Sequence, residues 1–224
     1  MLRRDDTELS HSWLDTALSR FAADNDDAVL RTRSLLARIV ADSPRHARMI
    51  NTLSMLEHIG SYKIMTTQHA PEIDQPTLKH VAEESHHAYF LKRQAEKAAA
   101  RPLEYVNDDL LAPAAARMYF QRLESGITHT LARPRSSQAA YLYMSMVVEF
   151  RALWFYGLYQ QALQRAQHAL SLKRILGEEQ SHLADIAHRL DVTGELSDAR
   201  TAAFLKHEKA LYRRLLDALH RAIN

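Results

Sequence analysis

Apolar residues recur three and four positions apart over most of the chain, which places them on one face of an α-helix. One such stripe contains Ile175, Leu176, Leu183 and Ile186. No segment shows the sustained alternation that is typical of a strand. The pattern predicts helices over 7–22, 27–42, 44–68, 76–100, 113–131, 136–163, 168–190 and 198–222, with each boundary placed to within about 2 to 4 residues.

Residues that begin helices support several of these boundaries. Ser43-Pro44 combines a capping residue with proline at the first helical position, and Asp74 before Gln75-Pro76 begins another helix in the same way. The region 157–177 has neither Gly nor Pro between its ends. The break that we expect near Gln164 therefore follows from helix length and geometry, since no turn-forming residue marks it.

Composition narrows the fold class further. The chain has 224 residues and a mass of 25.7 kDa, with 46% hydrophobic and 25% charged residues, which suits one globular domain over 1–224. Only 5 Gly and 6 Pro are present, so turns are scarce and long helices are favoured. The net charge is +2 and the basic residues are dispersed among acids. Nothing here indicates a nucleic-acid or membrane partner.

The absence of cysteine restricts the chemistry. With 0 Cys and 13 His, disulfides, thiolate nucleophiles and iron–sulfur clusters are excluded, and a metal must be held by oxygen and imidazole nitrogen. The N-terminus lacks the apolar core of a signal peptide, and no apolar run approaches the roughly 18 residues of a membrane span. We therefore expect a cytoplasmic protein.

Two segments carry the same motif, Glu-Glu-x-x-His. The first is Glu83-Glu84-Ser85-His86-His87 and the second is Glu178-Glu179-Gln180-Ser181-His182. Positions three apart share one face of a helix, so Glu84 with His87, and Glu179 with His182, each present an oxygen and a nitrogen ligand together. Both pairs also lie on stripes of apolar residues, which predicts that they face the core.

Each motif is preceded by a further glutamate. Glu57 lies 27 positions before Glu84, and Glu149 lies 30 positions before Glu179. In antiparallel helices these side chains become level when the turn falls midway, and the first midpoint is beside Pro71. Glu149 is surrounded by apolar neighbours, so its carboxylate needs a partner. That partner is either a metal ion or an arginine, such as Arg151 or Arg117.

These residues resemble the ferritin-like di-metal carboxylate family, in which two helices each give a Glu and two others each give Glu-x-x-His. The resemblance covers about 44–190 and implies a four-helix bundle with additional helices at both ends. It also implies two iron ions, with manganese or a mixed pair left open. The implied ligands are Glu57, Glu84, His87, Glu149, Glu179 and His182.

The doubled Glu-Glu-x-x-His form is similar to the oxygen-activating branch, which includes acyl carrier protein desaturases and p-aminobenzoate N-oxygenase. His80, one turn before Glu84, is a candidate seventh ligand. An additional histidine resembles the N-oxygenase type, but there it precedes the second motif, where this chain has Ile175. The first acid of each motif, Glu83 or Glu178, stands four residues before a ligand histidine and is a candidate acceptor for its outer N–H; a solvated acid is the alternative.

The resemblance implies an oxidoreductase in which two ferrous ions activate O2 and oxidise a small or carrier-bound organic substrate. The catalytic carboxylates are then Glu57, Glu84, Glu149 and Glu179. Such an enzyme needs an electron donor, and a homodimer is left open. One alternative is a ferritin-like protein that oxidises or stores iron without an organic substrate. Another is a metal-free helical interaction protein. A haem-oxygenase-like di-iron scaffold would leave Glu149 and the second motif unused.

Overall fold

The described part of the chain is helical. The computed structural model describes residues 4–67, 73–131 and 137–224. Within them it contains eight α-helices, one short 3-10 helix and no strand. The elements are α1 (Arg4–Asp24), α2 (Asp26–Val40), α3 (Ser43–Thr67), α4 (Gln75–Ala99), η1 (Asn107–Asp109), α5 (Pro113–Thr130), α6 (Ser137–Arg165), α7 (Lys173–Val192) and α8 (Asp198–Ala222). The predicted all-α class is confirmed.

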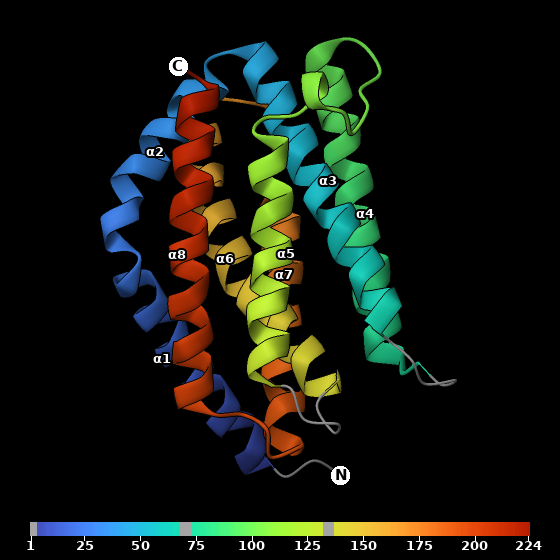
Figure 1. Ribbon diagram of the computed structural model, residues 1–224, viewed down its shortest axis with the longest axis vertical. Helices are drawn as coiled ribbons and strands as arrows, with labels where there is room; N and C mark the ends of the chain where they lie inside the picture. Colours follow the sequence, from blue (N-terminus) through green and yellow to red (C-terminus); the bar gives the residue numbers. More distant parts are fainter. Residues whose placement is uncertain (1–3, 68–72, 132–136) are drawn as a thin grey trace.

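The helices run roughly along the long axis of the molecule (Figure 1). α3 packs along α4 and α6 packs along α7, and these two pairs make the most extensive helix contacts. α5 packs beside α8, and α2 lies against α6. None of the described helices combines the length and the apolar character that a membrane crossing requires.

Two helix starts test the capping predictions. The Asp74 side chain accepts a hydrogen bond of 2.8 Å from the Thr77 amide, so α4 begins as predicted. At the start of α3, however, the cap is Asp42, whose Oδ1 accepts from the Arg45 amide at 2.9 Å. Ser43 instead donates to the carbonyl of Ala98. The predicted turn beside Pro71 lies outside the described residues.

The break between α6 and α7 lies close to its predicted position. Gln167 adopts a left-handed conformation with φ of 51°, which ends α6 without glycine. Side chains then satisfy the exposed backbone: Gln160 Oε1 accepts from the Leu172 amide at 2.6 Å, and His168 Nδ1 accepts from the Leu170 amide at 3.0 Å. The next helix therefore begins at Lys173 and not at 168.

α6 is the most enclosed helix of the bundle. Its buried positions occur on all sides of the helix, including Tyr143, Met146, Phe150 and Tyr159, each 0% exposed. A helix that is apolar all round is typical of the centre of a helical protein. This position explains why Glu149, which projects from α6, is also buried at 4% exposure.

Candidate metal centre

All seven predicted ligand residues come together between four helices. They are Glu57 on α3; His80, Glu84 and His87 on α4; Glu149 on α6; and Glu179 and His182 on α7. Six of them are buried, and Glu57 is partly buried. Ionisable groups gathered in an apolar core are costly unless they are paired or bind a metal ion, so this cluster calls for an explanation.

The seven residues form two groups that share one carboxylate. The first group is His80, Glu84, Glu149 and His182, and the second is Glu57, Glu84, His87 and Glu179. Within each group, one potential ligand atom from every residue lies within 4.8 Å of the others. Two adjacent groups joined by Glu84 form the arrangement expected for two ions with a bridging carboxylate.

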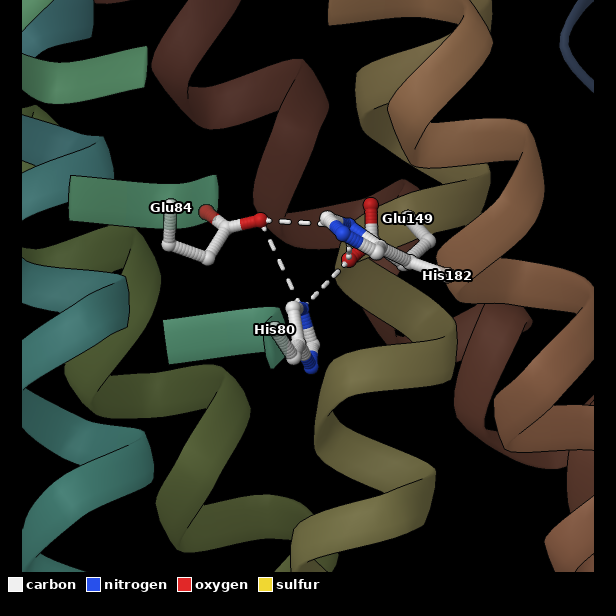
Figure 2. Close-up of side chains that lie close together, drawn as sticks. All are labelled: His80, Glu84, Glu149 and His182. Carbon is white, nitrogen blue, oxygen red and sulfur yellow. Dashed lines mark hydrogen bonds and ion pairs between the residues drawn. The ribbon is translucent and has the colours of Figure 1, made fainter. Parts of the chain in front are cut away.

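Figure 2 shows the first group, in which the side chains point toward a common centre. Glu84 Oε1 is 3.4 Å from His80 Nε2 and 3.4 Å from His182 Nδ1. His80 Nε2 is also 3.2 Å from Glu149 Oε1. Atoms bound to a single ion at about 2.1 Å are themselves about 3 to 3.5 Å apart. The spacing in this group therefore suits a shared ion.

The second group lies on the other side of Glu84. His87 Nδ1 is 3.2 Å from Glu179 Oε1 and 3.8 Å from Glu84 Oε1. Glu179 also reaches the first group, because its Oε2 is 3.0 Å from His182 Nδ1. Glu179 is thus a second carboxylate that touches both groups.

The outer nitrogens of the two motif histidines are held in a crossed arrangement. His87 Nε2 contacts Glu178 Oε2 at 2.9 Å, and His182 Nε2 contacts Glu83 Oε2 at 2.8 Å. Each acid therefore serves the histidine of the opposite helix, so the prediction that it serves the histidine four residues later was wrong. The paired motifs face each other, and each acid points across the interface between α4 and α7. With the outer N–H donated to a carboxylate, Nδ1 of each ring is left to face the centre.

The carboxylates of the cluster differ in pKa. Burial, with the nearby charges of Glu84 and Glu179, raises the pKa of Glu57 well above its ordinary value. Burial also opposes ionisation of Glu149, but contacts from His182 and His80 outweigh it and lower the pKa of Glu149. Without metal, the cluster therefore keeps a proton on the Glu57 side, where carboxylates crowd together.

The histidines carry the balancing positive charge. Burial alone would lower the pKa of His80, but its hydrogen bond to Glu149 and the nearby Glu84 raise that pKa to about 9. Burial is likewise outweighed at His87, where Glu179 and Glu84 raise the pKa to about 9. In the metal-free protein, the protons on these rings balance the negative charge of the carboxylates. Bound metal ions would take over that role and displace the protons.

The residues fit a pair of divalent transition-metal ions. Two buried atoms that face the centre, Glu84 Oε1 and His87 Nδ1, lie near oppositely charged groups but meet none of them in hydrogen-bond geometry within the described structure. A buried acceptor or donor without a partner is uncommon in proteins, and a bound ion would satisfy both atoms. Four carboxylates with three imidazoles also match the ligand preferences of iron and manganese.

The arginine alternative for Glu149 is not observed. Arg151 forms two hydrogen bonds of 2.8 Å with Glu208 on α8, and Arg117 donates to the carbonyl of Tyr105. Glu149 has His80 and His182 as its partners.

Two tyrosines of α6 contact the cluster and were not predicted. The Tyr156 hydroxyl is hydrogen-bonded to Glu57, and the Tyr141 hydroxyl lies 3.2 Å from His80 Nδ1. A signal was present in the sequence: Tyr141 and Tyr156 stand eight positions before and seven positions after Glu149, which places all three on one face of the helix.

Three cavities within the described structure border the cluster, and two of them reach its carboxylates. A cavity of about 100 Å³ with an apolar wall, formed by α3, α5, α6 and α8, reaches the carboxylates of Glu57, Glu84 and Glu179. A wider cavity of about 300 Å³ reaches His80, Glu84 and Glu149. The two cavities adjoin, because Glu84, Phe120, Val148 and Glu149 line both of them. The carboxylates of the cluster therefore border two adjoining cavities.

Comparisons with protein-family models, with curated proteins and with solved structures find no match to this chain. The case for its function therefore rests on the geometry of the cluster.

The raised pKa values of His80 and His87 predict a pH dependence that only the metal-free protein shows. Because both pKa values are about 9, against 6.5 ordinarily, the protonated rings stabilise the folded state below about pH 6.5. That contribution is lost as the pH rises through about 9, and each pKa unit is worth about 1.4 kcal/mol.

Chemical denaturation of chelator-treated protein should show a loss of more than about 1.4 kcal/mol over this interval. Protein loaded with Zn²⁺ should not show it, because the ions displace the protons. The exposed His129 provides a control, since His129→Gln should leave the profile of the metal-free protein unchanged. A flat profile for metal-free protein would contradict the charge assignment.

Proposed function

We propose that the protein is a ferritin-like di-iron oxidoreductase that uses O2 to oxidise an organic substrate. The observation that carries the proposal is the pair of four-residue groups that share Glu84. When bound, two iron ions would supply the electrons that O2 activation requires, while the bridging carboxylates offset changes in their charge. Manganese in one or both positions would use the same ligands.

The roles of the chain's own residues follow from their contacts. Glu84 and Glu179 touch both groups and would help to hold both ions, whereas Glu57 and Glu149 each belong to a single group. His87 and His182 are fixed in orientation by Glu178 and Glu83. This outer hydrogen bonding holds the imidazoles in the tautomer that binds metal.

The cavities favour an enzyme over an iron store. Substrate pockets are concave and mostly apolar with a few polar groups, and the wider cavity has this character. It is lined by apolar residues that include Ile64, Phe120 and Met144, by the polar Ser145 and Tyr141, and by the ion pair of Lys63 and Glu124. We infer that an organic substrate binds there, next to His80 and Glu149. An iron-oxidising protein without an organic substrate is the second candidate, since the same ligands would serve it.

The test begins with metal analysis of protein from iron-supplemented cells. We expect about two iron ions per chain, followed by a change in the optical spectrum when the anaerobically reduced protein meets O2. Oxidation of an added apolar organic compound supports the oxidoreductase. Uptake of iron far beyond two ions per chain, without oxidation of any organic compound, would favour the iron-handling alternative. A content of one iron ion per chain, or of none, would contradict the di-metal proposal.

His80 offers a sharper test of the first group. Because His80 Nε2 lies near both Glu84 and Glu149, His80→Ala should keep the fold and the ion of the second group while changing the optical response to O2. His86, on the same helix and exposed, provides the matched control His86→Ala. Wild-type spectra and O2 consumption in the His80 variant would show that His80 is not a ligand.

A further inference from the structure

A row of neighbouring aromatic side chains leads away from the candidate metal centre along α6. It begins at Tyr156, whose hydroxyl is hydrogen-bonded to Glu57. The ring centroid of Tyr156 is 6.1 Å from that of Phe155, which is 6.2 Å from that of Tyr159. All three side chains are buried. This row of aromatic side chains therefore connects the candidate ligand Glu57 with the interior of the bundle.

The row continues to the surface through two histidines. The Tyr159 hydroxyl and His46 Nε2 are 2.5 Å apart, and both side chains are buried, with exposures of 0% and 1%. The His46 ring packs edge-on against that of His168, with centroids 4.7 Å apart. His168 is exposed in the turn between α6 and α7. On α3, His46 lies 11 residues before Glu57, so the row spans about 16 Å along that helix.

Tyr159 and His46 have the features of a pair that exchanges an electron and a proton. A phenol gives up an electron far more readily when a base accepts its proton, and the only such base in contact with Tyr159 within the described structure is His46. Burial, with the nearby His168, lowers the pKa of His46 to about 4. The ring is therefore neutral at pH 7 and has a nitrogen lone pair available.

We propose that Tyr156, Tyr159 and His46 form a relay that carries oxidising equivalents from the metal centre toward the surface at His168. The relay rests on the proposed function, which supplies the oxidant. In the balanced step, Tyr159 loses one electron toward Tyr156 and the oxidised centre, and its hydroxyl proton moves to His46 Nε2. A one-electron donor at the surface returns the electron, and the proton moves back to the tyrosine oxygen.

The first test uses the full chain without metal. The sequence has no cysteine, so Ala169→Cys, at an exposed position next to His168, gives one attachment site for a ruthenium photo-oxidant. A laser flash should produce the absorption and electron paramagnetic resonance signals of a neutral tyrosyl radical. Tyr159→Phe, which keeps the ring, should lose them.

Two matched controls accompany this test. Tyr143→Phe removes the hydroxyl of another buried tyrosine of α6 that lies outside the row, and it should leave the radical unchanged. A label on Thr193→Cys, at an exposed position at the far end of α7 and about 30 Å along that helix, should give far less radical. An undiminished signal in Tyr159→Phe, or an equal yield from the label at position 193, would overturn the relay and leave the hydrogen bond as a structural tie.

The second test examines the inner end of the relay. Iron-loaded protein exposed to O2 without an organic substrate should develop the same radical, and Tyr156→Phe should lose it while keeping its iron. Oxidation of bound iron with no radical would overturn the relay but not the proposed function. Failure to bind iron would overturn the proposed function and the inner end of the relay, even where the flash experiment succeeds.

Discussion

Replacing Glu84 by alanine should release both metal ions, whereas replacing either Glu57 or His80 should release at most one. The difference follows from geometry, because Glu84 belongs to both groups while Glu57 and His80 each belong to one. Removal of Glu84 also takes away a negative charge that would attract both cations, so their mutual repulsion is less well offset. Metal content per chain, measured by elemental analysis after gel filtration, distinguishes the three variants.

Two further variants calibrate this result. Glu96→Ala, three turns later on the same helix and outside both groups, should keep two ions. Glu83→Ala removes the carboxylate that holds His182, and it should weaken metal affinity by about 10 to 100-fold without abolishing binding. A Glu84 variant that retains one tightly bound ion would show that the two groups are independent sites.

The second large effect concerns two buried glutamates that have different partners. Glu208, 0% exposed, accepts two hydrogen bonds of 2.8 Å from Arg151 and one of 2.7 Å from Tyr119. Glu208→Ala leaves the arginine charge buried without its partner. The variant should lose about 3 to 5 kcal/mol of unfolding free energy, equally with iron and with chelator.

Glu149→Ala should behave differently, because its partners are histidines and, when present, metal. An arginine cannot lose its proton inside a protein, whereas His80 and His182 can become neutral when Glu149 is removed. In chelator, the loss of stability should therefore be smaller than that of Glu208→Ala. With iron, Glu149→Ala should lose the metal of the first group and the stabilisation that this metal gives to the folded protein.

Thermal and urea denaturation of wild type and both variants, each with iron and with chelator, provide the comparison. An equally large loss for both variants under both conditions would place Glu149 in the structural core. A metal-dependent loss for Glu208→Ala would show that the pair of Arg151 and Glu208 supports the metal centre.

Local patterns in the sequence were sufficient to predict the helices and the seven residues that gather in the cluster. Helical periodicity is a property of each segment alone, so the spacing of Glu84 and His87 places both on one face wherever that helix packs. The same holds for Glu179 and His182. The scarcity of Gly and Pro limited the number of breaks, and seven of the eight helix starts lie within about three residues of their predicted positions.

The exception, the start of α7, illustrates what the pattern could not determine. Gln160 and His168 provide the side-chain partners that end one helix and delay the next, and neither residue type is a turn signal by itself. The cap of α3 was misassigned for a related reason. Ser43 and Asp42 are both competent caps, and the packing of α3 against Ala98 of α4 engages the serine.

Only the tertiary structure decided how the helices share the centre. The sequence could not show that Glu84 belongs to both groups, that Glu83 and Glu178 cross to the opposite histidines, or that Tyr156 contacts Glu57. These contacts join residues on different helices, 91 to 99 positions apart where they are hydrogen bonds. They depend on the rotation and the offset of each helix against its neighbours, which are set by packing of the whole core and not by any single segment.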